Sequence, residues 1–197
     1  MNKFLNDLER KIGKYAIVNL TKYIVMLYAV GYVLQLAPQS VNITNLLNLD
    51  PYLILKGQVW RLVSWVLIPP GSFSLLIIIT LMFYYFVGNG MERTLGTFRY
   101  NVFIFGGMIL MIIASFVTML VYQVFFGITG DALGMLMFRS SGAFSTYYIQ
   151  MMVFLAFSVI YPDIQVLLMF LIPIKVRWIP IAYGIILAYQ CIGALIN

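Results

Sequence analysis

Charged residues are so sparse in this chain that long apolar stretches separate them. A helix needs about 20 mostly apolar residues to cross a bilayer. Five stretches approach that length: Leu20–Leu36, Phe73–Val87, Asn101–Phe126, Ser145–Tyr161 and Ile179–Ile196. Hydrophobic residues make up 63% of the chain and charged residues only 9%, which excludes a soluble globular fold. We therefore expect an all-α polytopic membrane protein with about five transmembrane helices.

A sixth apolar run, Ile164–Ile174, is too short to span a bilayer and contains Pro173. We expect residues 162–178 to form a re-entrant or interfacial segment on the cytoplasmic side. Residues 1–15 place Phe4, Leu5, Leu8 and Ile12 on one helical face, which predicts an amphipathic N-terminal segment on the inner leaflet. Without an internal repeat or a linker, residues 1–197 are expected to form a single membrane domain.

Lysine and arginine concentrate in the segments that would be cytoplasmic if the N-terminus were inside. That orientation places nine of the twelve basic residues on the inner side and three on the outer side. The nine are Lys3, Arg10, Lys11, Lys14, Lys22, Arg93, Arg99, Lys175 and Arg177, and the three are Lys56, Arg61 and Arg139. The positive-inside rule therefore predicts a cytoplasmic N-terminus and an external Asn197.

The chain contains no histidine and one cysteine, Cys191. Ser–His and Cys–His dyads are thus excluded, and neither a zinc site nor an internal disulfide is expected. We expect no cofactor and no metal. The net charge of +6 is explained by membrane anchoring rather than by nucleic-acid binding.

The segment from Gly88 to Tyr100 carries glycines at its start, then Glu92, Gly96 and Arg99. Physically the segment predicts a helix end, a tight cytoplasmic turn and a helix start, and its glycines permit close backbone approach. Glu92 can accept hydrogen bonds from freed loop amides or pair with Arg93 or Arg99.

A second motif, Trp60-Arg61, lies in residues 37–72, the expected interfacial first external loop. Trp60 suits a membrane interface, and Arg61 can reach loop carbonyls or lipid phosphate. Together with Tyr161-Pro162-Asp163 and Leu171–Trp178, the two motifs resemble the rhomboid superfamily in their order along the chain. The resemblance implies a rhomboid-like helical bundle.

The catalytic positions of rhomboid proteases are not filled by catalytic residues here. The resemblance places Phe144 where those proteases have their serine nucleophile, with Ser145 one residue late. Leu76 and Thr80 stand where the oxyanion-supporting His and Asn would be. The family's sixth helix, which carries the catalytic His, has no counterpart before Asn197. We expect no catalytic residue and no enzyme activity.

The resemblance implies a catalytically inactive rhomboid-like protein that handles other transmembrane segments, as inactive relatives such as the derlins do. A small carrier or channel subunit and, for a truncated chain, an intramembrane serine protease are the alternatives. The candidate structural or client-binding residues are Trp60, Arg61, Glu92, Arg99 and Gln150, the last by interhelical hydrogen bonding. Membrane lipids and transmembrane helices are the expected partners, and the plasma membrane of a bacterium is the expected location.

The predicted topology can be tested by cysteine labelling in a Cys191→Ser background. A cysteine at Asp163 should be protected from an impermeant thiol reagent added outside intact cells, because positions 162–178 are expected to be cytoplasmic. Labelling of that position from outside would overturn the five-span topology.

Overall fold

The computed structural model describes residues 2–36, 43–71, 74, 76–168, 172–176, 178, 180 and 181. It divides the chain into two compact units, Met1–Met151 and Met152–Asn197. The expectation of a single membrane domain therefore stays a prediction, and each unit is described by itself.

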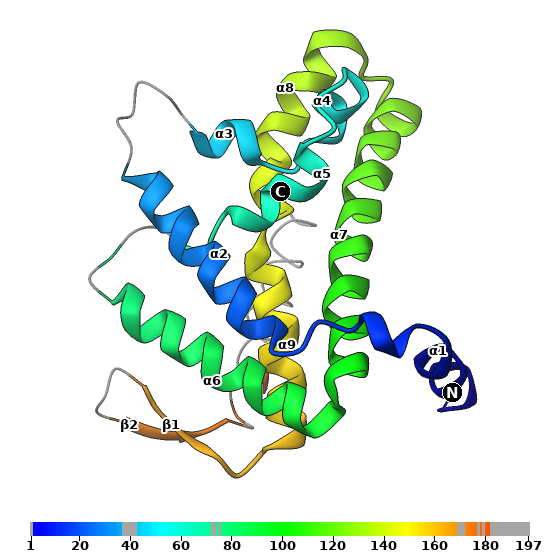
Figure 1. Cartoon of the computed structure of the whole chain (residues 1–197). Helices are drawn as coiled ribbons and strands as arrows, with labels where there is room; N and C mark the ends of the chain where they lie inside the picture. Colours follow the sequence, from blue (N-terminus) through cyan, green and yellow to red (C-terminus); the bar gives the residue numbers. More distant parts are fainter. Residues whose placement is uncertain are drawn as a thin grey trace. The chain divides into compact units, whose positions relative to one another are not determined.

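Long helices form the frame of the first unit (Figure 1). They are α1 (Asn2–Ile12), α2 (Leu20–Gln35), α6 (Ile77–Leu95), α7 (Thr97–Phe126) and α8 (Gly130–Ser140), with short 3-10 turns at Gly13–Tyr15 and Ser141–Ala143. Helix α9 (Thr146–Ile160) begins in this unit and ends in the second. Helix α2 packs against α6, and α6 packs against α7.

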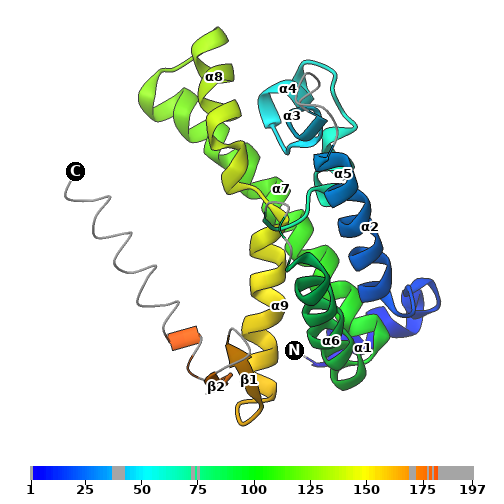
Figure 2. The same cartoon turned by 90° about the vertical axis from the view of Figure 1, so that its left-hand side faces the viewer.

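The segment expected as an interfacial loop folds into short helices: α3 (Ile43–Leu47), α4 (Pro51–Leu55), α5 (Arg61–Ser64) and the 3-10 turn η2 (Trp65–Leu67). Figure 2 shows these helices at one end of α2, with α1 and the α6–α7 corner at the other. Tyr52 of α4 packs on a buried cluster of Met119, Leu133 and Met137 from α7 and α8. This cluster fixes the short helices to the longer ones.

Within the part of the chain that the structure describes, two helical stretches are long and apolar enough to cross a bilayer: Thr97–Phe126 and Gly130–Ile160. Leu5–Tyr15 and Leu20–Gln35 are joined at an angle of 60°, and they provide a third candidate span if the bent pair is counted as one. These findings agree with a helical membrane protein, but they do not confirm a count of five. The fifth expected span, Ile179–Ile196, lies almost entirely outside the described residues.

The segment from Gly88 to Tyr100 contains the predicted helix end, turn and helix start, because α6 ends at Leu95 and α7 begins at Thr97. The chain turns only at Gly96, which has a φ of 84°, a value that suits glycine. Gly88 instead permits close packing: a Cβ there would lie 2.5 Å from Thr21 Cγ2 and 2.8 Å from the Tyr100 hydroxyl. Gly88 thus provides the close backbone approach expected of the glycines, and Gly96 provides the turn.

Helix α8 was not predicted either, since its residues were assigned to an external loop. Its glycine at position 134 faces the Tyr52 ring, where a Cβ would come within 2.5 Å of Cε1. The second unit holds another unpredicted element, an antiparallel hairpin of β1 (Gln165–Leu168) and β2 (Ile172–Lys175). The segment expected to be re-entrant or interfacial is therefore a strand pair in its described part, because backbone pairing satisfies its amides locally.

Gly88→Ala should destabilise the first unit by about 1–3 kcal/mol, because the added methyl group overpacks the contact with Thr21 and Tyr100. Thermal unfolding in detergent measures the loss. Gly106→Ala is the matched control, since nothing lies within 4 Å of a Cβ at that helical position. Equal melting temperatures for the two variants would contradict the contact.

Candidate functional site

The Trp60-Arg61 motif closes the C-terminal end of α3. Arg61 is 3% exposed, and its Nη1 donates to the carbonyl oxygens of Asn45 and Asn48 at 2.8 and 2.9 Å. Its Nε donates to Gln58 Oε1 at 2.7 Å. Of the two expected partners, loop carbonyls and lipid phosphate, the structure places Arg61 on the carbonyls.

The two carbonyls between these are bound by the neighbours of Arg61. The Trp60 indole Nε1 donates to Leu46 O at 3.3 Å, and Ser64 Oγ donates to Leu47 O at 3.2 Å. The last carbonyls of a helix have no partner inside it. The motif therefore acts as a C-terminal cap built from another helix.

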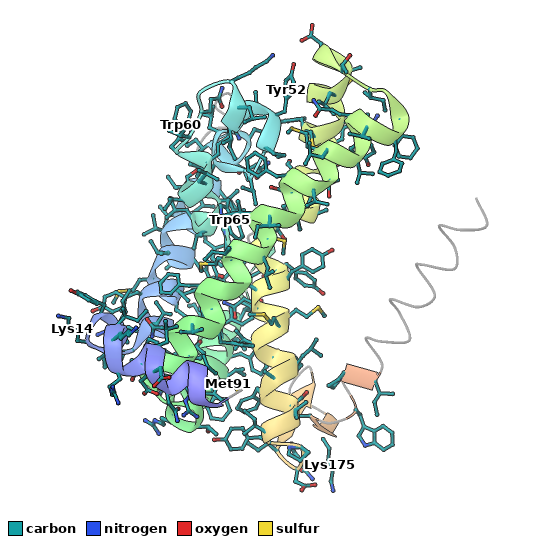
Figure 3. The ribbon with its side chains drawn as sticks, turned by 90° about the vertical axis from the view of Figure 1, so that its right-hand side faces the viewer. Lys14, Tyr52, Trp60, Trp65, Met91 and Lys175 are labelled. Carbon is teal, nitrogen blue, oxygen red and sulfur yellow. The ribbon has the colours of Figure 1, made fainter. Side chains whose placement is uncertain are left out.

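Trp60 remains 52% exposed despite its hydrogen bond, whereas Trp65 is 1% exposed. Figure 3 shows Trp60 in the loop helices, at the end of the first unit opposite Lys14 and Met91. Trp60 is thus the residue of the motif that is available to a membrane or a partner, and Arg61 is not.

Burial lowers the pKa of Arg61, and the nearby Asp50 carboxylate opposes that shift. Asp50 is itself buried, and its Oδ1 accepts from the amides of Tyr52 and Leu53 at the start of α4. Arginine remains protonated despite such a shift. The pair thus places one buried cation and one buried carboxylate inside the short-helix cluster.

Glu92 binds the chain between α1 and α2. Its Oε1 accepts the Asn19 amide hydrogen at 2.8 Å. Asn101 completes the clamp: its Oδ1 accepts from Ile17 N, and its Nδ2 donates to Ile17 O, both at 2.9 Å. Two alternatives were expected for Glu92, a hydrogen bond from a freed amide or a pair with Arg93 or Arg99. The structure shows the first, with an amide from another part of the chain.

Arg99 contacts α1. Its Nη2 donates to Asn6 Oδ1 at 2.9 Å, and its Nε lies 3.7 Å from Glu9 Oε2. Both charged side chains are 46% exposed, so this ion pair contributes little to stability. Arg99 positions the N-terminal helix and does not fix the α6–α7 turn.

The positions that correspond to the catalytic residues carry other contacts. Phe144 is 8% exposed, and the neighbouring Thr146 is 1% exposed with its hydroxyl donating to Ile68 O at 2.5 Å. Leu76 is 58% exposed, and Thr80 Oγ1 donates to the carbonyl of Leu76 in its own helix. Among the described residues, no three His, Cys, Asp or Glu side chains form a candidate metal site.

Gln150 makes an interhelical hydrogen bond, from its Nε2 to the Tyr28 hydroxyl at 3.1 Å. Together with the bond from Thr146 to Ile68 it joins the start of α9 to α2 and to the loop helices. Sequence reasoning missed Asn19, Asn101 and Thr146, because their partners lie 73, 84 and 78 positions away. Their only sequence signal is a polar side chain at the end of an apolar stretch.

An apolar groove lies between α2, the α5–η2 segment and α7, with a volume of about 480 Å³. Its walls include Leu27 of α2, Val63 of α5 and Phe105 of α7, which are 37%, 74% and 41% exposed. No sequence pattern predicted it, since three separate segments form it.

Arg61→Met should lower stability by at least about 2 kcal/mol, because two helix carbonyls and the Gln58 side chain lose a charged donor. Thermal unfolding of the purified protein measures the effect. Lys56→Met is the matched control: Lys56 is exposed, and its ammonium lies over the Tyr52 ring, 4.3 Å from the centroid. A similar small loss in both variants would show that Arg61 is not the cap.

The family model described as "Eukaryotic integral membrane protein (DUF1751)" matches residues 20–197. The expected location in the plasma membrane of a bacterium is therefore wrong, because the family is eukaryotic, while integral membrane placement is confirmed. Comparisons with curated proteins and with solved structures gave no significant match. With nine-tenths of its length covered by the family model, the chain belongs to the DUF1751 family of eukaryotic integral membrane proteins.

Proposed function

We propose that this protein is a catalytically inactive, rhomboid-like membrane protein that binds the transmembrane segments of other proteins. The observation that carries the proposal is the apolar groove between α2, α5–η2 and α7, which opens on residues that no described segment covers. The proposal that the protein is rhomboid-like rests on the resemblance of the Trp60-Arg61 and Glu92 motifs to that superfamily.

The absence of proteolysis is supported by the surroundings of the candidate nucleophile. A serine protease needs a base within hydrogen-bond reach of the hydroxyl. The chain has no histidine, and the hydroxyl of Thr146, next to Ser145, is bonded to a backbone carbonyl. Lys56 does not serve as a base, because the hydrogen bond that its ammonium donates to Tyr52 raises its pKa.

The groove suits a helix rather than a small polar substrate. Leu27, Val63 and Phe105 present aliphatic and aromatic surface from three segments, and large exposed apolar patches mark interaction sites. Within a bilayer the gain on helix association comes from close packing and displaced lipid rather than from water release. A groove whose apolar walls come from three separate segments fits helices of varied sequence.

The short helices next to the groove also fit this function. Trp60 is half-exposed, and its indole binds the end of α3, which suits a membrane interface. A cluster of short helices at that depth would thin the adjacent lipid and favour a client segment of imperfect hydrophobic length. In this proposal Trp60 contacts lipid or client, and Arg61 maintains the cluster.

Site-specific photocrosslinking tests the proposal. With a photoreactive phenylalanine analogue at position 105, the reconstituted protein should crosslink a single-span test helix in liposomes and leave it uncut. The same probe at Val124, which is 73% exposed on α7 and lines none of the cavities described, is the control. Leu27→Trp, which narrows the groove, should reduce crosslinking from position 105 several-fold.

Equal crosslinking from positions 105 and 124 would refute binding in the groove. Cleavage of the test helix that disappears in Ser145→Ala would refute inactivity instead. The two failures are distinguishable, because one is read from crosslinked product and the other from fragments.

A further inference from the structure

Two cavities adjoin along α6, near its corner with α7. An apolar one of about 590 Å³ is lined by α6 and by Val25 of α2. A smaller one of about 230 Å³ lies at the α6–α7 corner and includes Glu92 and Asn19. Tyr85, Asn89 and Arg93 line both, so we take the two together as one cavity with an apolar and a polar part. Figure 1 shows α2 and α6 side by side above this corner.

Glu92, which lines the polar part, has one carboxylate oxygen without a hydrogen-bond partner among the described residues. Glu92 is 7% exposed, and only its Oε1 is used, by the Asn19 amide. Its Oε2 is buried and has no hydrogen-bond partner among the described residues. A buried oxygen of this kind is costly unless a donor reaches it, and a cationic donor is the most favourable.

The next residue supplies the opposite charge. Arg93 is exposed, and it has neither a hydrogen bond nor an ion pair in the described part of the chain. The cavity therefore offers the Glu92 carboxylate as an acceptor for a cation and the Arg93 guanidinium as a donor to an anion, on consecutive residues. This arrangement is complementary to a zwitterion rather than to a simple ion.

The apolar part is long enough for a hydrocarbon chain. Ile78, Met82 and Phe86 repeat every four residues on α6 and are 71%, 67% and 56% exposed. They form a stripe of about 12 Å, since a helix rises about 1.5 Å per residue. That length covers most of one leaflet of a hydrocarbon core that is about 30 Å thick.

We propose that this cavity binds a glycerophospholipid with a primary ammonium in its headgroup, a phosphatidylethanolamine. The ammonium donates to Glu92 Oε2, the phosphate binds the Arg93 guanidinium, and an acyl chain lies along Ile78, Met82 and Phe86. A choline headgroup lacks N–H donors and leaves the carboxylate oxygen unpaired. This inference does not rest on the proposed client binding, which uses a different groove.

Native mass spectrometry of the full chain provides the test, in detergent micelles that contain equal amounts of palmitoyl-oleoyl phosphatidylethanolamine and phosphatidylcholine. The native chain should retain the ethanolamine lipid about tenfold better, the effect of one charge-assisted hydrogen bond. Glu92→Gln keeps an acceptor for Asn19 and should remove this preference. Arg93→Gln and Met82→Trp should weaken retention of both lipids.

Two matched controls separate the site from general lipid contact. Arg139→Gln removes an exposed arginine on α8, and Met26→Trp enlarges a methionine of α2 that lines neither part of the cavity. Both should bind like the native chain. Thermal unfolding of every variant identifies any that fails to fold, and Arg93→Gln and Met82→Trp then still decide the question.

Equal retention of the two lipids by the native chain would overturn the proposal. So would a preference that survives Glu92→Gln in a folded protein. Retention that is the same in all variants and controls would show that only annular lipid is bound, and displacement of both lipids by a transmembrane peptide would assign the cavity to a protein segment.

Discussion

A backbone group inside hydrocarbon must find its hydrogen-bond partner within the protein, and that constraint organises the first unit. The helical chain is interrupted between Gly13–Tyr15 and Leu20, where Asn19 adopts a left-handed conformation with a φ of 57°. The interruption frees backbone amides and carbonyls. Glu92 and Asn101 from the α6–α7 corner bind them, which holds the start of α2 against that corner.

The opposite end of the unit meets the same constraint with different residues. The last carbonyls of α3 are bound by Trp60, Arg61 and Ser64 from the next short helices. At both ends, therefore, a side chain from a neighbouring element completes a helix terminus. The motifs on which the rhomboid resemblance rests are these terminus-binding residues, so they reflect how the chain satisfies its backbone as much as what it does.

The distribution of charge and hydropathy predicted the elements whose stability is set locally. Helix α7 was expected from Asn101 to Phe126 and runs from Thr97 to Phe126, and the expected start of α2 at Leu20 is confirmed. The failures occurred where tertiary packing decides. The residues Gly130–Ser140 were assigned to an external loop, yet they form α8, whose Gly134 packs against the Tyr52 ring.

The same distinction separates the candidate site residues. Their positions in the chain marked Trp60, Arg61 and Glu92 as unusual, since each is a polar or interfacial residue in a motif between apolar stretches. Their hydrogen-bond partners could not be predicted from the sequence. The Asn19–Glu92 contact, for example, spans 73 positions and depends on the arrangement of the helices. Neither cavity could be predicted, since each collects residues from helices that are distant in sequence.

These contacts leave the unit with few free polar groups and with apolar surface that the described segments do not cover. Thr146, Gln150 and Arg61 are all bound within the protein, so they are not available to a reacting substrate. Two buried carboxylate oxygens, Asp50 Oδ2 and Glu92 Oε2, have no hydrogen-bond partner among the described residues, and Glu92 is followed in sequence by the exposed Arg93 at the end of an apolar stripe. When the polar side chains of a protein bind its own backbone, the protein recognises its ligands mainly by shape and by hydrophobic contact. Such recognition suits ligands from the bilayer itself, namely lipid chains and transmembrane helices.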